Sequence, residues 1–203
     1  MSLCATVVGT DDDNCGWTGD RAAAAMHQAI CNSVKAGVFY AVAAGNDSHD
    51  FLTDVPAAFN EVLTVTAMAD FDGEPGSTGL STCRPDNQDD TAATFSNYTH
   101  AGSSDESHTI AAPGVCIKST WKGGRYKTIS GTSMATPHTT GTAALCIASG
   151  KCSGTPADIM NTLRTDAEQQ SNLTTVPYYG FKGDPNTTGT TIYYGYLEYA
   201  GGY

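Results

Sequence analysis

Ser133 is the residue of this sequence whose surroundings most clearly suit a nucleophile. It belongs to the stretch Gly131-Thr132-Ser133-Met134-Ala135-Thr136-Pro137-His138. A serine in a first helical turn lies beside backbone N–H groups that have no intrahelical partner, and beside the positive end of the helix dipole. Such a hydroxyl can attack an acyl carbon while the nearby N–H groups stabilise the oxyanion. On position alone, an ordinary N-cap serine is the simpler alternative.

Alternating helices and apolar runs are predicted around this serine. Helices are expected over residues 20–36, with Asp20 as N-cap and Gly37 as the stop, over 132–149, and from Thr155 onward behind a capping box. The helix over 132–149 consists of small residues and is expected to be buried. Three apolar runs suit buried parallel strands: 38–44, 62–68 and 109–112. The pattern indicates an α/β fold with a mainly parallel sheet and helices on both faces.

The string around Ser133 resembles the nucleophile motif Gly-Thr-Ser-Met-Ala-x-Pro-His of the subtilase family of serine proteases, peptidase family S8. Other stretches resemble landmarks of that family in the same order: Met1-Ser2-Leu3, Ala43-Ala44-Gly45-Asn46, Phe95-Ser96-Asn97-Tyr98, Ala112-Pro113-Gly114-Val115 and Tyr194-Gly195-Tyr196-Leu197. The resemblance implies that residues 1–203 are the C-terminal portion of one subtilase catalytic domain. The expected architecture is a three-layer subtilisin-like fold with its N-terminal part missing. Residues 70–94 would form a surface insertion, and 172–203 an irregular segment with short strands.

The resemblance also implies roles for individual residues. Ser133 is the expected acylating nucleophile. The side chain of Asn46, at the carboxyl end of the first predicted strand, is the expected oxyanion donor, and the substrate is a polypeptide. Six residues are expected to bind this substrate: Ser2, Leu3 and Cys4 along its extended backbone, and Ala43, Ala44 and Gly45 as the wall of the P1 pocket. No cofactor is required, although structural calcium is an option in the acidic stretches 70–73 and 86–90.

Two members of the subtilase triad are absent from this sequence. The subtilisin triad runs in the order Asp, His, Ser, so the acid and the base are expected in polypeptide preceding Met1. Cys4 stands where the family typically has glycine, and Thr139-Thr140 replace small apolar residues. The chain alone is expected to be inactive and poorly soluble, because the missing strands would leave sheet edge and apolar surface exposed. The five histidines are expected to be structural or surface residues: His27, His49, His100, His108 and His138.

Two alternatives compete with a serine endopeptidase. One is a truncated, non-catalytic subtilase relative that acts as a binding or structural module. An upstream reading frame with Asp-x-Gly and His-Gly-Thr-His segments continuous with Met1 would argue against it. The other is a hydrolase with a G-x-S-x-G elbow, which the sequence excludes because residue 135 is alanine and no histidine follows His138.

The composition fits an exported protein. The net charge of −11 argues against nucleic-acid binding, and no apolar run is long enough to span a membrane. Seven cysteines without a C-x-x-C pair favour disulfides over a zinc site. Spacing alone does not decide the pairing. We expect Cys4 to be left over and the pairs to be Cys15–Cys31, Cys83–Cys116 and Cys146–Cys152.

Secretion also bears on two further features of the sequence. The first residues lack a basic segment and a long apolar run, so a signal peptide and propeptide are expected upstream of Met1. Asn97, Asn172 and Asn186 each open an Asn-x-Thr tripeptide. These tripeptides are either glycosylation acceptors or chance matches in a threonine-rich chain.

Overall fold

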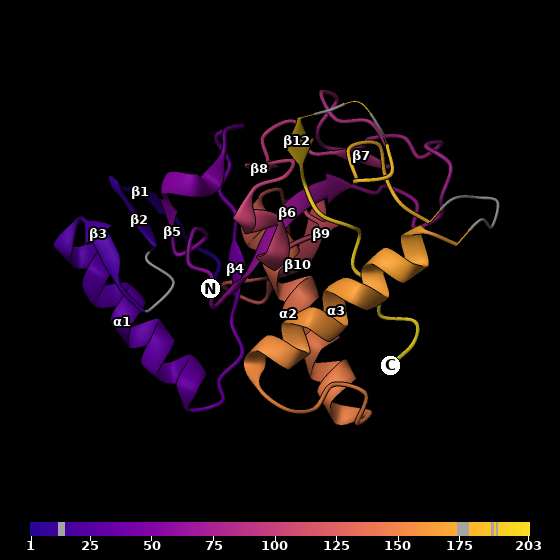
Figure 1. Ribbon diagram of the computed structural model, residues 1–203. Helices are drawn as coiled ribbons and strands as arrows, with labels where there is room; N and C mark the ends of the chain where they lie inside the picture. Colours follow the sequence, from indigo (N-terminus) through magenta and orange to yellow (C-terminus); the bar gives the residue numbers. More distant parts are fainter. Residues whose placement is uncertain (12–14, 174–178, 188, 190) are drawn as a thin grey trace.

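The computed structural model describes residues 1–11, 15–173, 179–187, 189 and 191–203. Its central sheet is built on β6 (Leu63–Ala69), which pairs in parallel with β4 (Ala41–Ala43) and with β9 (Thr109–Pro113) (Figure 1). The short strand β7 (Thr91–Ala92) pairs antiparallel with the end of β6. The mainly parallel sheet predicted from the three apolar runs is confirmed.

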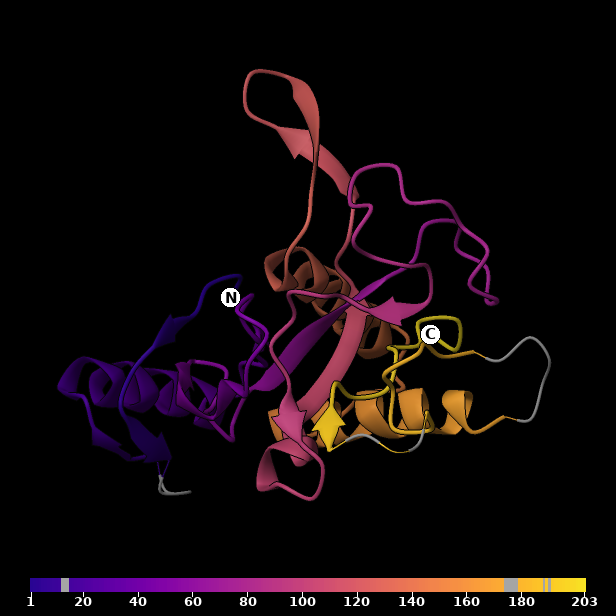
Figure 2. The same cartoon turned by 90° about the horizontal axis from the view of Figure 1, so that it is seen from above.

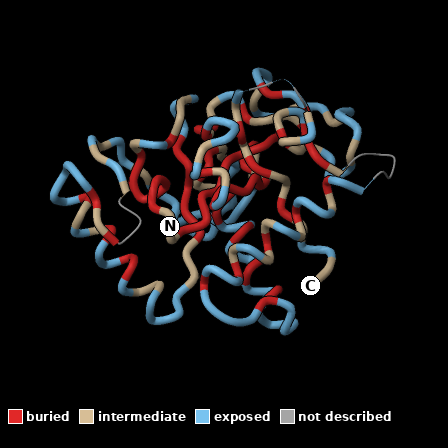
Figure 3. The backbone as a smooth tube through the Cα atoms, in the orientation of Figure 1, coloured by how far each residue is buried: buried red, intermediate tan, exposed pale blue. Residues whose placement is uncertain are grey.

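Helices cover both faces of this sheet. α2 (Thr132–Ala148) packs on the face that carries Val65, and α3 (Pro156–Ser171) contacts α2 and completes the same core cluster. The other face carries Val42, which packs in a second cluster with α1 (Arg21–Lys35). In Figure 3 the buried backbone runs along the sheet strands between these helices. The result is the three-layer α/β arrangement predicted from the sequence.

Short antiparallel pairs surround the sheet. They are β1 (Ala5–Thr6) with β5 (Asp54–Val55), β2 (Gly9–Asp11) with β3 (Trp17–Gly19), β8 (Thr99–His100) with β12 (Ile192–Tyr193), and β10 (Ile117–Trp121) with β11 (Arg125–Ile129). Two 3-10 turns complete the described elements: η1 (Phe51–Thr53) and η2 (Ser104–His108). Figure 2 shows the β10–β11 hairpin projecting away from the body of the molecule.

The predicted helix ends are confirmed by local hydrogen bonds. The Asp20 side chain accepts the N–H of Ala23 at 2.8 Å, so α1 begins where the sequence predicted, and Gly37 follows its end with a φ of 93°. At α3, the Thr155 side chain accepts the N–H of Asp158, and the Asp158 carboxylate accepts the N–H of Thr155. These caps act within a few residues, which is why the sequence alone was sufficient to place them.

Two predictions about these elements were wrong. α2 is not buried throughout, because the sheet and α3 cover only one side of it, and Leu145 on the other side is 53% exposed. The predicted strand over 38–44 is shorter, since β6 begins at Leu63, whose N–H donates to the carbonyl of Tyr40, and residues 38 and 39 have no partner strand. Val38 is accordingly 46% exposed.

The two segments predicted to be irregular differ from each other. The predicted surface insertion over 70–94 contains no helix or strand up to residue 90, and β7 occupies residues 91 and 92. The end of the irregular part is anchored, because Asn87 and Asp89 are buried. The Asp89 carboxylate accepts the N–H groups of Phe71 and Gly79, and so ties the segment together. Within the described part of 172–203, the regular structure consists of β12 and two isolated bridges, from Lys182 to β7 and from Leu197 to β9.

The cysteines pair as predicted. The disulfides are Cys15–Cys31, Cys83–Cys116 and Cys146–Cys152, and the thiol of Cys4 is free. Among the described residues, no helix combines the length and the apolar character needed to cross a bilayer.

Candidate active site

The first turn of α2 leaves one backbone donor open at Ser133. The N–H of Thr132 donates to Oδ1 of Asn46 at 2.8 Å, and the N–H groups of the two residues after Ser133 donate to the carbonyl of Gly131. Among the described residues, no acceptor meets the N–H of Ser133. Unpaired N–H groups are expected in the first turn of a helix, but here three of the four are satisfied. The remaining donor therefore lies beside the hydroxyl predicted to be the nucleophile.

The side chain of Asn46 is oriented by α2. Its Oδ1 accepts the N–H of Thr132 and lies 3.2 Å from the Thr132 hydroxyl, which is itself buried and also accepts the N–H of Gly45. Within the described part of the chain, Nδ2 of Asn46 has no hydrogen-bond acceptor. Because Oδ1 of Asn46 is bound to the start of α2, its Nδ2 lies near the same helix end as the N–H of Ser133. Both donors are free within the described residues. Two such donors can stabilise the oxyanion of an acyl-transfer reaction.

The start of the chain lies against this site. The hydroxyl of Ser133 donates to the carbonyl oxygen of Ser2 at 3.0 Å. Just before it, Met1 lies in parallel register beside β4, because its N-terminal amine donates to Ala41 and its carbonyl accepts the N–H of Ala43. Ser2 and Leu3 are exposed. The structure thus brings the predicted substrate-binding stretch to the predicted nucleophile.

The predicted wall of the P1 pocket is tightly packed. Ala43 and Ala44 are fully buried, so their side chains belong to the core rather than to an open pocket. Gly45 has a φ of 109°, and a Cβ there would lie 2.3 Å from Nδ2 of Asn97 and 3.2 Å from the sulfur of Cys4. Only glycine fits at this position. Cys4 therefore occupies space next to the predicted pocket.

The thiol of Cys4 is not activated. Burial raises its pKa, and the carboxylates of Asp54 and Asp47 raise it further. Because the thiolate is the reactive form, this environment keeps Cys4 a neutral thiol near pH 7. Of the Cys4 and Ser133 side chains, that of Ser133 is therefore the candidate nucleophile.

No histidine contacts Ser133 in the part of the chain that the structure describes. His49 bonds Asp54 at 2.7 Å, and His138 bonds the carbonyl of Met134 on its own helix. The other three are held by carboxylates elsewhere: His27 by Glu61 and Asp11, His100 by Asp50, and His108 by Asp105. Burial opposes a charge on His27, but the hydrogen bond to Glu61 and the charge of Asp11 outweigh it and raise its pKa. All five have the structural contacts that the sequence predicted for them.

Comparison with known protein families matches residues 3–189 to the subtilase family. The chain belongs to the subtilase family. The alkaline serine protease ver112 of Corniculantispora psalliotae is 38% identical over 166 residues, and the cuticle-degrading protease of Metarhizium anisopliae is 37% identical over 155 residues. These alignments cover 79% and 76% of this subtilase, but only 36% and 33% of the two relatives.

Solved structures support the subtilisin-like fold. A cold-adapted subtilisin-like serine proteinase superposes on 98% of this subtilase with a TM-score of 0.63 and 27% identity, and sphericase on 85% with a TM-score of 0.60 and 26% identity. The superposed regions are 53% and 51% of those two chains. The chain thus spans about a third of the curated relatives and about half of the solved structures that it matches.

Asn97 is a site residue of this subtilase that the sequence analysis missed. Its Oδ1 accepts the N–H groups of Asp47 and His49, and its Nδ2 donates to the carbonyl of Ala44 and to the carboxylate of Asp54. These four bonds hold the loop that carries Asn46. Asn97 is fully buried, so its Asn-x-Thr tripeptide is a chance match and not a glycan acceptor. Its place in a family landmark was the only signal in the sequence.

Replacing Asn97 by Ala is expected to lower the free energy of unfolding by about 2 kcal/mol, because the buried Asp54 carboxylate and the Ala44 carbonyl each lose a donor. Urea unfolding of the variant measures this change. The exposed Asn172→Ala is the matched control and should change stability by less than about 0.5 kcal/mol. Equal stability of both variants would show that the Asn97 bonds do not support the loop.

The remaining Asn-x-Thr asparagines, Asn172 and Asn186, are exposed. The threonines that complete their tripeptides, at 174 and 188, lie outside the described residues.

Within the described residues of this subtilase, three sets of side chains have ligand-like spacing, and two of these sets share Glu61 and so form one group. The acidic stretches predicted for calcium contribute Asp70, Asp72 and Asp89, whose oxygens lie within 4.8 Å of one another. Several of these oxygens accept backbone N–H groups, which alone can account for their clustering. Calcium at this position therefore stays a prediction.

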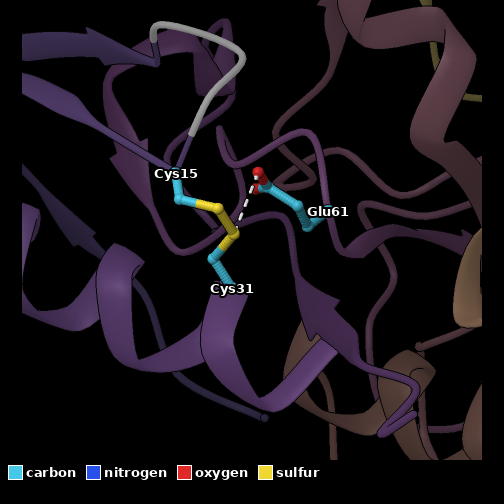
Figure 4. Close-up of side chains that lie close together, drawn as sticks. All are labelled: Cys15, Cys31 and Glu61. Carbon is cyan, nitrogen blue, oxygen red and sulfur yellow. Dashed lines mark hydrogen bonds between the residues drawn. A yellow bond between two sulfur atoms is a disulfide. The ribbon is translucent and has the colours of Figure 1, made fainter. Parts of the chain in front are cut away.

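The second group is built around Glu61. One of its oxygens bonds His27, and the other lies 3.7 Å from the sulfur of Cys31 (Figure 4). In Figure 4 the Glu61 side chain reaches from its loop toward the Cys15–Cys31 disulfide. Together these contacts tie α1 to the segment before β6. The charges of this group are paired within it, which indicates a structural role.

Proposed function

We propose that this chain is the nucleophile-bearing part of a secreted serine endopeptidase that cleaves polypeptides through an acyl-enzyme. The observation that carries the proposal is the contact between Asn46 and the start of α2, which leaves Nδ2 of Asn46 and the N–H of Ser133 as free donors next to the Ser133 hydroxyl. Membership of the subtilase family supports the same chemistry.

In the proposed reaction, the oxygen of Ser133 attacks the scissile carbonyl and gives its proton to a base. The carbonyl oxygen becomes an oxyanion, which accepts hydrogen bonds from Asn46 and from the N–H of Ser133. The amine leaves with that proton, and water then releases the acyl group. In the resting state the Ser133 hydroxyl donates to Ser2, so the base must replace that acceptor.

We propose that the base and its aspartate belong to polypeptide outside this chain. Four observations support this. The chain spans about a third of the curated relatives, and the described histidines bond elsewhere. Among the described residues, only Met1 forms hydrogen bonds with the edge of β4 that faces away from β6. This pattern is the one expected where a neighbouring strand ends. The open side of α2 also exposes Leu145, an apolar surface that a further part of the domain would cover.

The proposed setting is extracellular. Disulfides form and persist mainly in oxidising compartments, so the three disulfides of this chain support export.

Fluorophosphonate labelling tests this function. The probe forms a covalent bond with an activated serine. A protein that joins the upstream reading frame to this chain is expected to be labelled at Ser133, whereas its Ser133→Ala variant and the 203-residue chain alone are not. Labelling of the isolated chain at Ser133 would contradict the proposal that the base lies outside it. A joined protein that stays unlabelled would contradict the protease function itself.

A truncated, non-catalytic relative is the second candidate. The observation in its favour is the hydrogen bond from Ser133 to Ser2, which leaves the hydroxyl without a base in the described chain. Sequencing the transcript separates the two candidates. Stop codons between Met1 and any upstream Asp-x-Gly segment would favour the non-catalytic module.

A further inference from the structure

The β10–β11 hairpin has two different faces. Strands β10 and β11 pair from Ile117 opposite Ile129 to Trp121 opposite Arg125, and alternate side chains of a strand point to opposite sides. One face therefore carries Ile117, Ser119, Trp121, Arg125, Lys127 and Ile129. The other carries Lys118 and Tyr126. Apart from the two isoleucines at its base, the hairpin is exposed, and Figure 2 shows it reaching away from the body.

A groove of about 390 Å³ lies between this hairpin and α2. Its walls include Ile117, Trp121, Lys127, Ile129, Met134 and Pro137. Met134 follows Ser133 directly, and residues four apart on a helix lie on the same side, which places Pro137 below Ser133. Ser133 itself does not line the groove, but its neighbour Met134 does, so the groove lies next to the first turn of α2.

The hairpin concentrates positive charge on an acidic protein. Lys118, Lys122, Arg125 and Lys127 are four of the chain's ten lysines and arginines, while the whole chain has a net charge of −11. No aspartate or glutamate occurs between Glu106 and Asp158. Within the described residues, none of these four cations lies within 4.0 Å of a carboxylate.

Aromatic rings hold two of these cations in place. The ammonium of Lys127 lies 4.5 Å from the ring centre of Trp121, and that of Lys118 lies 5.7 Å from the ring centre of Tyr126. Cation–π contacts restrain the lysines without neutralising them. Lys127 lies on the hairpin face that lines the groove, and Lys118, although it belongs to the other face, also borders the groove. The groove thus combines apolar walls with restrained cations that form no ion pair within the described residues.

We propose that this groove binds acidic side chains of the polypeptide substrate beside Ser133. The proposal rests on the proposed endopeptidase function and specifies its substrate class. Charge complementarity favours aspartate and glutamate, and the apolar walls fit the intervening side chains of a peptide. An extended nucleic acid fits poorly, because its phosphates would meet the negative charge of the rest of the molecule.

Peptide binding tests the proposal without requiring catalysis. The probe is a fluorescein-labelled peptide of alternating Glu and Leu, compared with its Gln–Leu counterpart by fluorescence anisotropy on the joined protein with Ser133→Ala. We expect the Glu peptide to bind about tenfold more tightly at low salt, since each exposed charge pair contributes up to about 1 kcal/mol. Raising the ionic strength should remove the difference.

The variant Lys118→Gln/Lys127→Gln should abolish the preference for the Glu peptide. Its matched control is Arg21→Gln/Lys35→Gln, which removes the same charge from exposed positions on α1 and should leave the preference intact. Three results would overturn the proposal: equal binding of both peptides, equal effects of the two double variants, or self-association of the chain that occupies the groove. Equally tight binding of a single-stranded oligonucleotide would also overturn it, in favour of a general anion site.

The two proposals can fail separately. If the Glu peptide binds as expected but the joined protein is not labelled at Ser133, the protease function is wrong and the groove is a peptide-binding surface. If labelling at Ser133 occurs but the peptides bind equally, only the substrate class is wrong. In the joined protein, cleavage of casein-derived peptides with and without acidic residues gives an independent readout.

Discussion

Replacing Asn46 by Asp is expected to slow acylation of Ser133 by about 100- to 1000-fold in the joined protein, which is the loss known for subtilisin when one oxyanion donor is removed. The substitution keeps Oδ1, so the N–H of Thr132 retains its acceptor and the start of α2 keeps its geometry. It replaces the two N–H donors of Nδ2 by an oxygen. The oxyanion then loses one hydrogen bond and meets a negative charge.

The kinetic signature distinguishes this role from a structural one. An interaction made only in the transition state lowers kcat and kcat/KM together and leaves KM nearly unchanged. Steady-state cleavage of a peptide substrate measures both constants. Asn32→Asp, the same chemical change at an exposed position on α1, is the control and should keep full activity. If Asn46→Asp also keeps full activity, Asn46 is not an oxyanion donor.

The parts of the site that the sequence predicted are those that depend on local geometry. Ser133 lies in a first helical turn, and Asn46 follows the end of a parallel strand, so their positions follow from the elements that carry them. Asn97 was missed because its role depends on four partners between residues 44 and 54, which are close to it only in the folded chain. No pattern around residue 97 encodes those contacts.

Two features of the fold were also not predicted, because they depend on contacts that exist only in the folded chain. The exposed side of α2 was not predicted, because the composition of a helix does not tell how many neighbours cover it. The β10–β11 hairpin was not predicted either, although Gly123 and Gly124 form its turn with φ values of 77° and 69°. The available signal was a pair of glycines between two short stretches, which is typical of a hairpin turn. The hairpin strands are mostly polar, so they lack the apolar run by which the core strands were predicted.

Glu198 provides the second prediction with a large effect, and it concerns pH. The side chain is 8% exposed and faces Thr139 of α2. Burial raises the pKa of the Glu198 carboxyl from about 4.5 to about 7, and the nearby Thr139 hydroxyl lowers it only weakly. No hydrogen bond of good geometry reaches Oε2 of Glu198 within the described residues. The neutral acid is therefore the form that fits this site.

The sign of the pH dependence follows from proton binding. Between pH 4.5 and 7 the folded chain holds a proton on Glu198 that the unfolded chain has released, so the free energy of unfolding decreases as the pH rises through this window. A shift of this size corresponds to about 3 kcal/mol. The stabilisation is complete below pH 4.5 and lost above pH 7. The other titrating groups that face Glu198 are Tyr179 and Tyr203, whose pKa values are raised further above the window.

Glu198→Gln is expected to remove this pH dependence, because glutamine keeps the shape of the neutral acid and cannot ionise. Urea unfolding of the 203-residue chain at pH 4.5, 6 and 7.5 measures the effect, and at pH 7.5 the variant should be the more stable protein. The exposed Glu74→Gln is the control and should follow the same pH curve as the unmodified chain. Parallel curves for Glu198→Gln and the unmodified chain would show that Glu198 is already ionised in the fold.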